Sequence, residues 1–109
     1  MDEYSIMRNP WVDDDLDNLY AYILGKFLDP FAAKNTLAGI IRAMEGLRFA
    51  PERGALLGVD KNQKQVRSIS VKGYAIVFVL DNKNKRVEII AVVMGRRDIS
   101  GLLDTLLRR

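Results

Sequence analysis

The sequence contains no cysteine and no histidine. Their absence excludes disulfide bonds, thiolate nucleophiles, imidazole general bases and the usual zinc sites. Any catalysis would depend on Lys, Arg, Tyr, Asp or Glu, and we expect neither a metal nor another cofactor.

Long apolar runs are also missing, since no stretch approaches the roughly 18 to 20 residues of a membrane-spanning helix. The opening residues, MDEYSI, lack the basic-then-apolar pattern of a secretory signal. We therefore expect a cytoplasmic protein with no membrane partner.

The length and the charge distribution bound the remaining possibilities. With 109 residues the chain can bury one hydrophobic core but not two, so we predict a single domain over residues 1–109. Residues 1–50 carry five Lys and Arg against eight Asp and Glu, a net charge of −3, whereas the rest carry twelve against six, a net charge of +6. The basic second half favours an anionic partner, either nucleic-acid phosphate or an acidic protein segment.

A strand and two helices are predicted in the first half. Residues 3–8 alternate loosely, as an edge strand does, and Asn9 and Pro10 then supply a cap and a first helical residue. Asp29 and Pro30 repeat this signal before a second helix. Apolar residues recur at helical spacing in both segments, at Val12, Leu16, Leu19, Ile23, Phe27 and at Ala33, Leu37, Ile40, Met44, Leu47. The short link between the segments predicts an antiparallel helical hairpin.

The second half predicts a sheet followed by a helix. Residues 51–65 are rich in turn formers and charge and are predicted to form a loop. Strands are then predicted up to residue 71 and over residues 74–80 and 87–94, joined by a tight turn at Lys72-Gly73 and by a polar connection. A last helix follows, with Asp98 as its cap. The order β-α-α-β-β-β-α predicts an α+β fold in which the helical hairpin packs on a mostly antiparallel four-stranded sheet.

This order and several local strings resemble the RelE/ParE superfamily of toxins from bacterial type II toxin-antitoxin modules. The strings are DLDNLYAYI, DPFAA, LRFAPERG, RSISVKGYAIVF and VEIIAVVMGRRDI, and they extend over nearly the whole chain. The resemblance implies a small basic toxin that inhibits growth, stabilises plasmids and is neutralised in a hetero-oligomer by a cognate antitoxin. The antitoxin would wrap the sheet and helices with its acidic C-terminal segment.

Members of the superfamily act on different targets. RelE-like toxins enter the ribosomal A site and cleave messenger RNA, whereas ParE-like toxins bind DNA gyrase and are not nucleases. RNA cleavage needs a proton acceptor, a proton donor and cations around the scissile phosphate. The resemblance to RelE-like enzymes would place arginine where this chain has Ala75, paired lysines near Val66 and Ser68, and a tyrosine near Leu103. The ParE-like interpretation is therefore favoured, with a metal-independent endoribonuclease as the alternative and a non-toxic nucleic-acid-binding or adaptor module as a third.

Five cations remain candidates for the functional site. In a nuclease, Arg97, Arg67 and Arg96 would be catalytic, and the resemblance fits Arg97 best. The same three arginines, together with Lys64 and Lys72, are the candidate substrate-binding residues. Guanidinium groups bind phosphate or carboxylate in a bidentate manner. The alternative is that these residues are ordinary exposed cations on strands, or that Arg97 pairs with a nearby aspartate.

Overall fold

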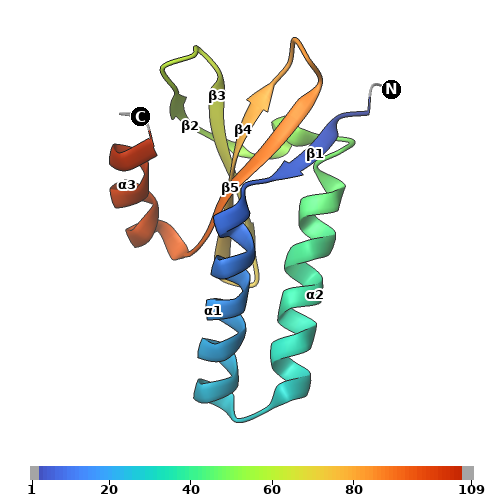
Figure 1. Ribbon diagram of the computed structural model, residues 1–109, viewed down its shortest axis with the longest axis vertical. Helices are drawn as coiled ribbons and strands as arrows, with labels where there is room; N and C mark the ends of the chain where they lie inside the picture. Colours follow the sequence, from blue (N-terminus) through green and yellow to red (C-terminus); the bar gives the residue numbers. More distant parts are fainter. Residues whose placement is uncertain (1–2, 107–109) are drawn as a thin grey trace.

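The computed structural model describes residues 3–106, with the backbone alone for residues 95–98, 100 and 106 (Figure 1). The described elements follow one another in this order: β1 (Ser5–Arg8), α1 (Pro10–Phe27), α2 (Pro30–Gly46), the short 3₁₀ turn η1 (Pro51–Arg53), β2 (Ala55–Val59), β3 (Gln65–Val71), β4 (Tyr74–Asp81), β5 (Arg86–Met94) and α3 (Gly95–Leu106). The predicted α+β class, helical hairpin and C-terminal helix are confirmed. None of the described helices is long and apolar enough to cross a membrane.

The sheet has five strands in the order β1-β5-β4-β3-β2, so the prediction of four strands is wrong. The additional strand is β2, which lies inside the segment that the sequence predicted as a loop. It pairs antiparallel with the first part of β3 through an irregular register between Leu56 and Gly58. The remaining pairings are antiparallel except that β1 runs parallel to β5, with Ser5 opposite Arg86.

Local signals set the ends of the two long helices. Pro10 and Pro30 begin α1 and α2, where a missing backbone N–H costs nothing. Asp29 caps α2, since its Oδ1 accepts the backbone N–H groups of Phe31 and Ala32 at 3.0 and 3.3 Å. Asn9 precedes α1 but its side chain does not cap the helix.

The two faces of the sheet are covered by different elements (Figure 1). The hairpin of α1 and α2 covers one face, and α3 lies against the other. The hairpin face holds the larger cluster, which includes Ile76, Phe78, Leu80, Val87 and Ile89 from the sheet. The α3 face holds Val66, Ala75, Val77, Ile90 and Ala91 beneath Ile99, Leu102 and Leu103. Alternation along β4 produces this division, because successive side chains point to opposite faces.

Two backbone irregularities position the ends of the central strands. Lys72 and Gly73 have φ angles of 52° and 86°, so the predicted tight turn between β3 and β4 is a hairpin turn with two left-handed residues. The register between β4 and β5 shifts near Val77, which pairs with Ala91 while Phe78 pairs with Ile89. Ile90 is the extra residue of this bulge, which shifts the register of the last part of β5 by one residue.

Candidate functional site

The described candidate cations lie apart on the fold. Lys64 precedes β3 at one end of the sheet, where its Nζ lies 3.3 Å from Oδ2 of Asp81. Lys72 lies at the opposite end of β3, in the turn to β4, with its side chain beside Gly39 of α2. Arg67 lies between them on β3. The backbone of Arg96 and Arg97 belongs to the first turn of α3, but their side chains fall outside the described part of the structure.

Arg67 holds the backbone of the segment before β2. Its Nη1 donates to the carbonyl oxygens of Gly54 at 2.6 Å and Glu52 at 3.2 Å, and its Nε donates to Oε1 of Gln65 at 2.9 Å. Because successive side chains of a strand point to opposite faces, Arg67 lies on the hairpin side of the sheet together with Ile69 and Val71. The guanidinium therefore has a structural task on the face opposite to that of Ala75.

The α3 face is apolar around Ala75, the position where the resemblance to RelE-like enzymes would place an arginine. Ala75 is 3% exposed, and Val66 and Val77 are exposed by 1% and 0%. Leu103, which stands near the position of the expected tyrosine, is partly buried against them with Ile99 and other residues of α3. Packed methyl groups can neither transfer a proton nor stabilise a developing negative charge. Among the described residues, no three Asp, Glu, His or Cys side chains gather to hold a metal ion.

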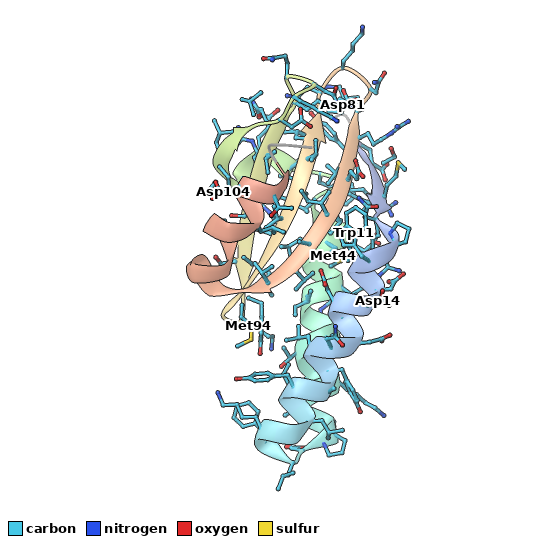
Figure 2. The ribbon with its side chains drawn as sticks, turned by 60° about the vertical axis from the view of Figure 1, so that its left-hand side comes forward. Trp11, Asp14, Met44, Asp81, Met94 and Asp104 are labelled. Atoms are coloured by element: carbon cyan, nitrogen blue, oxygen red, sulfur yellow. The ribbon has the colours of Figure 1, made fainter. Side chains whose placement is uncertain are left out.

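A groove that sequence reasoning missed lies between α1 and the last part of β5. It has a volume of about 310 Å³ and is lined mainly by apolar and aromatic groups: Leu19 and Tyr22 of α1, Tyr74 of β4, and Val92, Val93 and Met94 of β5, with Asp15 and Asn18 at the polar edge. Figure 2 shows Met94 at the end of the sheet opposite to Asp81. The groove is lined by segments that are distant in the sequence, so periodicity alone could not reveal it.

A second hollow of about 340 Å³ adjoins the first and carries the cations. Lys26 and Lys72 line it together with Tyr22, Phe27 and Tyr74. Lys26 lies over two aromatic rings, with its Nζ 5.8 Å from the centroid of Tyr22 and 5.4 Å from that of Phe27. The two hollows share Tyr22, Tyr74 and Met94. Together they form an apolar path with lysines at one end, and we call this path the hairpin groove.

Side chains of α1 cover the part of β5 that β1 does not reach. The Trp11 indole N–H donates to the carbonyl oxygen of Ile90, and Oδ2 of Asp15 accepts the backbone N–H of Val92 at 3.2 Å. Burial raises the pKa of Asp15, the hydrogen bond from Val92 opposes this rise, and the charge of Asp14 adds to it. These contacts satisfy an otherwise open strand edge and fix α1 beside the groove.

The fold is shared with solved toxin-antitoxin structures. A chain of the chromosomal ParDE system from P. aeruginosa superposes with a TM-score of 0.66 at 18% identity, over 86% of this chain and 98% of that chain. For the RelBE2 complex from Mycobacterium tuberculosis the TM-score is 0.61 at 21% identity, over 86% and 93%. A free E. coli RelE toxin with two arginines replaced by alanine gives 0.62 at 14% identity, over 98% and 97%. These similarities define the RelE/ParE-like fold class.

The sequence itself places the chain more narrowly. A family model described as the ParE toxin of the type II toxin-antitoxin system, parDE, matches residues 8–99. The chain belongs to this family of toxins. A search of curated proteins gives no significant match.

Proposed function

We propose that this toxin acts on DNA gyrase in the ParE-like manner and does not cleave RNA. The observation that carries the proposal is the packing of the α3 face, where Ala75 is buried among aliphatic side chains. A nuclease would need cations and a proton-transfer group at such positions. The family match to ParE toxins over residues 8–99 supports the same choice.

The remaining arginines do not restore a nuclease site in this proposal. Arg67 is committed to backbone carbonyls on the hairpin side of the sheet. Arg96 and Arg97 begin α3 beside the end of β5, where guanidinium groups are suited to a carboxylate or phosphate of the target. We therefore propose Arg97, and then Arg96, as contacts with gyrase; Lys64 is paired with Asp81 at the other end of the sheet, and Lys72 lines the hairpin groove.

The partner of the hairpin groove is proposed to be the cognate antitoxin. The groove combines apolar walls with Lys26 and Lys72 at one end. An amphipathic or extended segment with acidic residues near one end is complementary to such a path. The proposed assembly is a hetero-oligomer in the cytoplasm, in which the single domain of residues 1–109 is held inactive.

Two purified assays test the target. The toxin is added to gyrase with relaxed plasmid DNA, and separately to ribosomes that carry messenger RNA. We expect supercoiling to be inhibited and the messenger to remain intact, with Arg97→Ala weakening the inhibition about tenfold or more, as expected when a charged group is removed from an interface. Messenger cleavage that disappears in Arg97→Ala or Arg67→Ala would overturn the proposal in favour of a RelE-like nuclease.

The antitoxin is tested by co-expression. Expression of the toxin alone should arrest growth, and the product of the adjacent small gene should relieve the arrest. Tyr22→Asp in the hairpin groove should weaken this relief, because it places a carboxylate on an apolar wall that would face an acidic segment. Asn35→Asp, an exposed change on α2 with the same charge, is the control and should leave the relief intact. Harmless expression of the toxin alone contradicts the proposal.

A further inference from the structure

The end of the sheet farthest from the turn between α1 and α2 carries two polar loops, each with a carboxylate that accepts backbone N–H groups of the loop. Residues 60–64 connect β2 to β3, and residues 82–85 connect β4 to β5. Both loops lie at the top of Figure 1. We call residues 60–64 and 82–85, with the adjoining Asp81 and Arg86, the loop pair.

Each loop turns its carboxylate inward. Oδ1 of Asp60 accepts the backbone N–H groups of Asn62 at 2.8 Å and Lys64 at 2.9 Å. Oδ1 of Asp81 accepts the backbone N–H of Asn84 at 3.1 Å, and its Oδ2 accepts the side-chain N–H of the same residue at 2.8 Å. The two negative charges are therefore used within the loops, and the outer surface of the loop pair presents cations and amides.

Contacts between and behind the loops hold their shape. Lys64 bridges them through its ion pair with Asp81. The second loop is tied to the N-terminal segment, since the Tyr4 hydroxyl donates to Oδ1 of Asn82 at 2.7 Å and Lys85 Nζ lies 5.1 Å from the centroid of the Tyr4 ring. Between the loops lies a cavity of about 330 Å³ whose lining includes the amides of Asn62, Gln63, Gln65, Asn82 and Asn84. The surface is thus preorganised.

Three cations of the loop pair remain available to a ligand. Lys61, Lys83 and Arg86 are exposed, and within residues 3–106 none of them forms an ion pair with a described carboxylate. Ammonium and guanidinium groups beside side-chain amides are hydrogen-bond donors suited to phosphate oxygens. The loop pair therefore offers hydrogen-bond donors that the loop contacts hold in place, and its carboxylates are turned inward.

The composition of the surface selects the class of ligand. Protein partners usually need an apolar or aromatic anchor, and the loops expose none. Single-stranded nucleic acids are bound by stacking bases on aromatic rings, and no aromatic residue occurs in 60–64 or 82–86. What remains is the backbone of a duplex, where bases are paired and phosphates are the accessible groups.

We propose that the loop pair binds the phosphate backbone of duplex DNA without reading its sequence. The choice of DNA over duplex RNA rests on the proposed action on gyrase, whose substrate is DNA. The loop pair lies at the opposite end of the sheet from the hairpin groove, so the toxin can contact DNA through one end while the groove faces another partner (Figures 1 and 2).

The test uses the full chain and a labelled DNA duplex of arbitrary sequence, with binding followed by fluorescence anisotropy over a salt series. The loop variant is Lys61→Gln with Lys83→Gln, and the matched control is Lys34→Gln with Arg42→Gln, which removes the same charge from exposed positions of α2. The loop variant should bind about tenfold more weakly, and its slope of log affinity against log salt should fall by about 1.8, or about 0.9 for each phosphate that is no longer neutralised. The control should keep the wild-type slope.

Three results would overturn the inference. They are no measurable DNA binding, equal losses of affinity in the loop variant and the control, and tighter binding to a duplex RNA than to DNA of the same length. The supercoiling assay on the same samples separates this inference from the proposed function. A toxin that inhibits gyrase without binding DNA contradicts only the loop-pair inference, and one that binds DNA without inhibiting gyrase contradicts only the gyrase target.

Discussion

The two faces of the sheet differ in the size of the residues that they bury. On the hairpin face, Phe78, Ile76 and Leu80 of β4 pack against two long helices, whereas the alternate residues Ala75 and Val77 lie on the face that α3 covers. The large side chains produce a core that stabilises the fold by burying much apolar area. The small ones allow one short helix to lie close to the sheet. The fold therefore depends mostly on the hairpin face.

The largest expected effect comes from breaking the hairpin face. Phe78→Ala removes a fully buried ring and should lower the free energy of unfolding by about 4 kcal/mol. Its neighbour Val77→Ala, on the α3 face of the same strand, should cost about 2 kcal/mol, because only two methyl groups are removed. Urea denaturation of both variants measures the difference. Equal decreases in stability would show that the two faces contribute alike.

A smaller effect tests whether the α3 face is closed to a catalytic cation. Ala75→Arg places a charged side chain under α3 and should cost about 3 kcal/mol through overpacking and desolvation. Ser70→Arg is the matched control, since Ser70 pairs with Ala75 across the strands but is exposed. It should change stability by less than about 0.5 kcal/mol. A freely tolerated Ala75→Arg would mean that α3 does not pack on this face as described.

The smallest expected effect on stability concerns Asp81, the last residue of β4. Hydrogen bonds from the side chain and backbone of Asn84, aided by Lys64, lower the pKa of Asp81 to about 2. Because the pKa in the unfolded chain is about 3.9, the ionised carboxylate stabilises the fold above about pH 4, and this contribution disappears as the pH falls toward 2. The melting temperature of Asp81→Asn should therefore lie below that of the wild type at neutral pH and converge with it in acid.

The control for this pH dependence is Asp104→Asn, which changes an exposed carboxylate of α3. Thermal unfolding of the three proteins across the acid range gives the comparison. If the gap between Asp81→Asn and the wild type stays constant down to pH 2, the carboxylate of Asp81 does not contribute through its ionised form.

The elements that the sequence predicted correctly are those with local causes. Pro10 and Pro30 begin helices because their rings favour that position, and Lys72-Gly73 forms the predicted turn because glycine accepts a positive φ. Asn9 shows the limit of such signals. It stands before α1, but its side-chain amide donates to Oε2 of Glu88 at 2.9 Å instead of capping the helix. That partner is distant in sequence.

The features that the sequence did not predict depend on contacts between distant segments. The strand β2 has only five residues, includes Gly58, and follows Gly54 directly, so its sequence is typical of a loop until β3 pairs with it. The last helix begins at Gly95, three residues before the predicted cap Asp98, because it continues directly from the end of β5. The backbone contacts of Arg67 and the hairpin groove likewise arise only once the sheet has formed.

The parallel pairing of β1 with β5 has a consequence for biosynthesis. Ser5 is made early, yet its partner Arg86 is translated 81 positions later. Ribosomes add about 5 to 20 residues per second, so the first strand and the hairpin wait several seconds for the strands that complete their core. Pairings between distant segments also form slowly. Until β5 has been made, β1 has no strand to pair with, and the apolar faces of α1 and α2 lack the sheet that buries them in the finished fold.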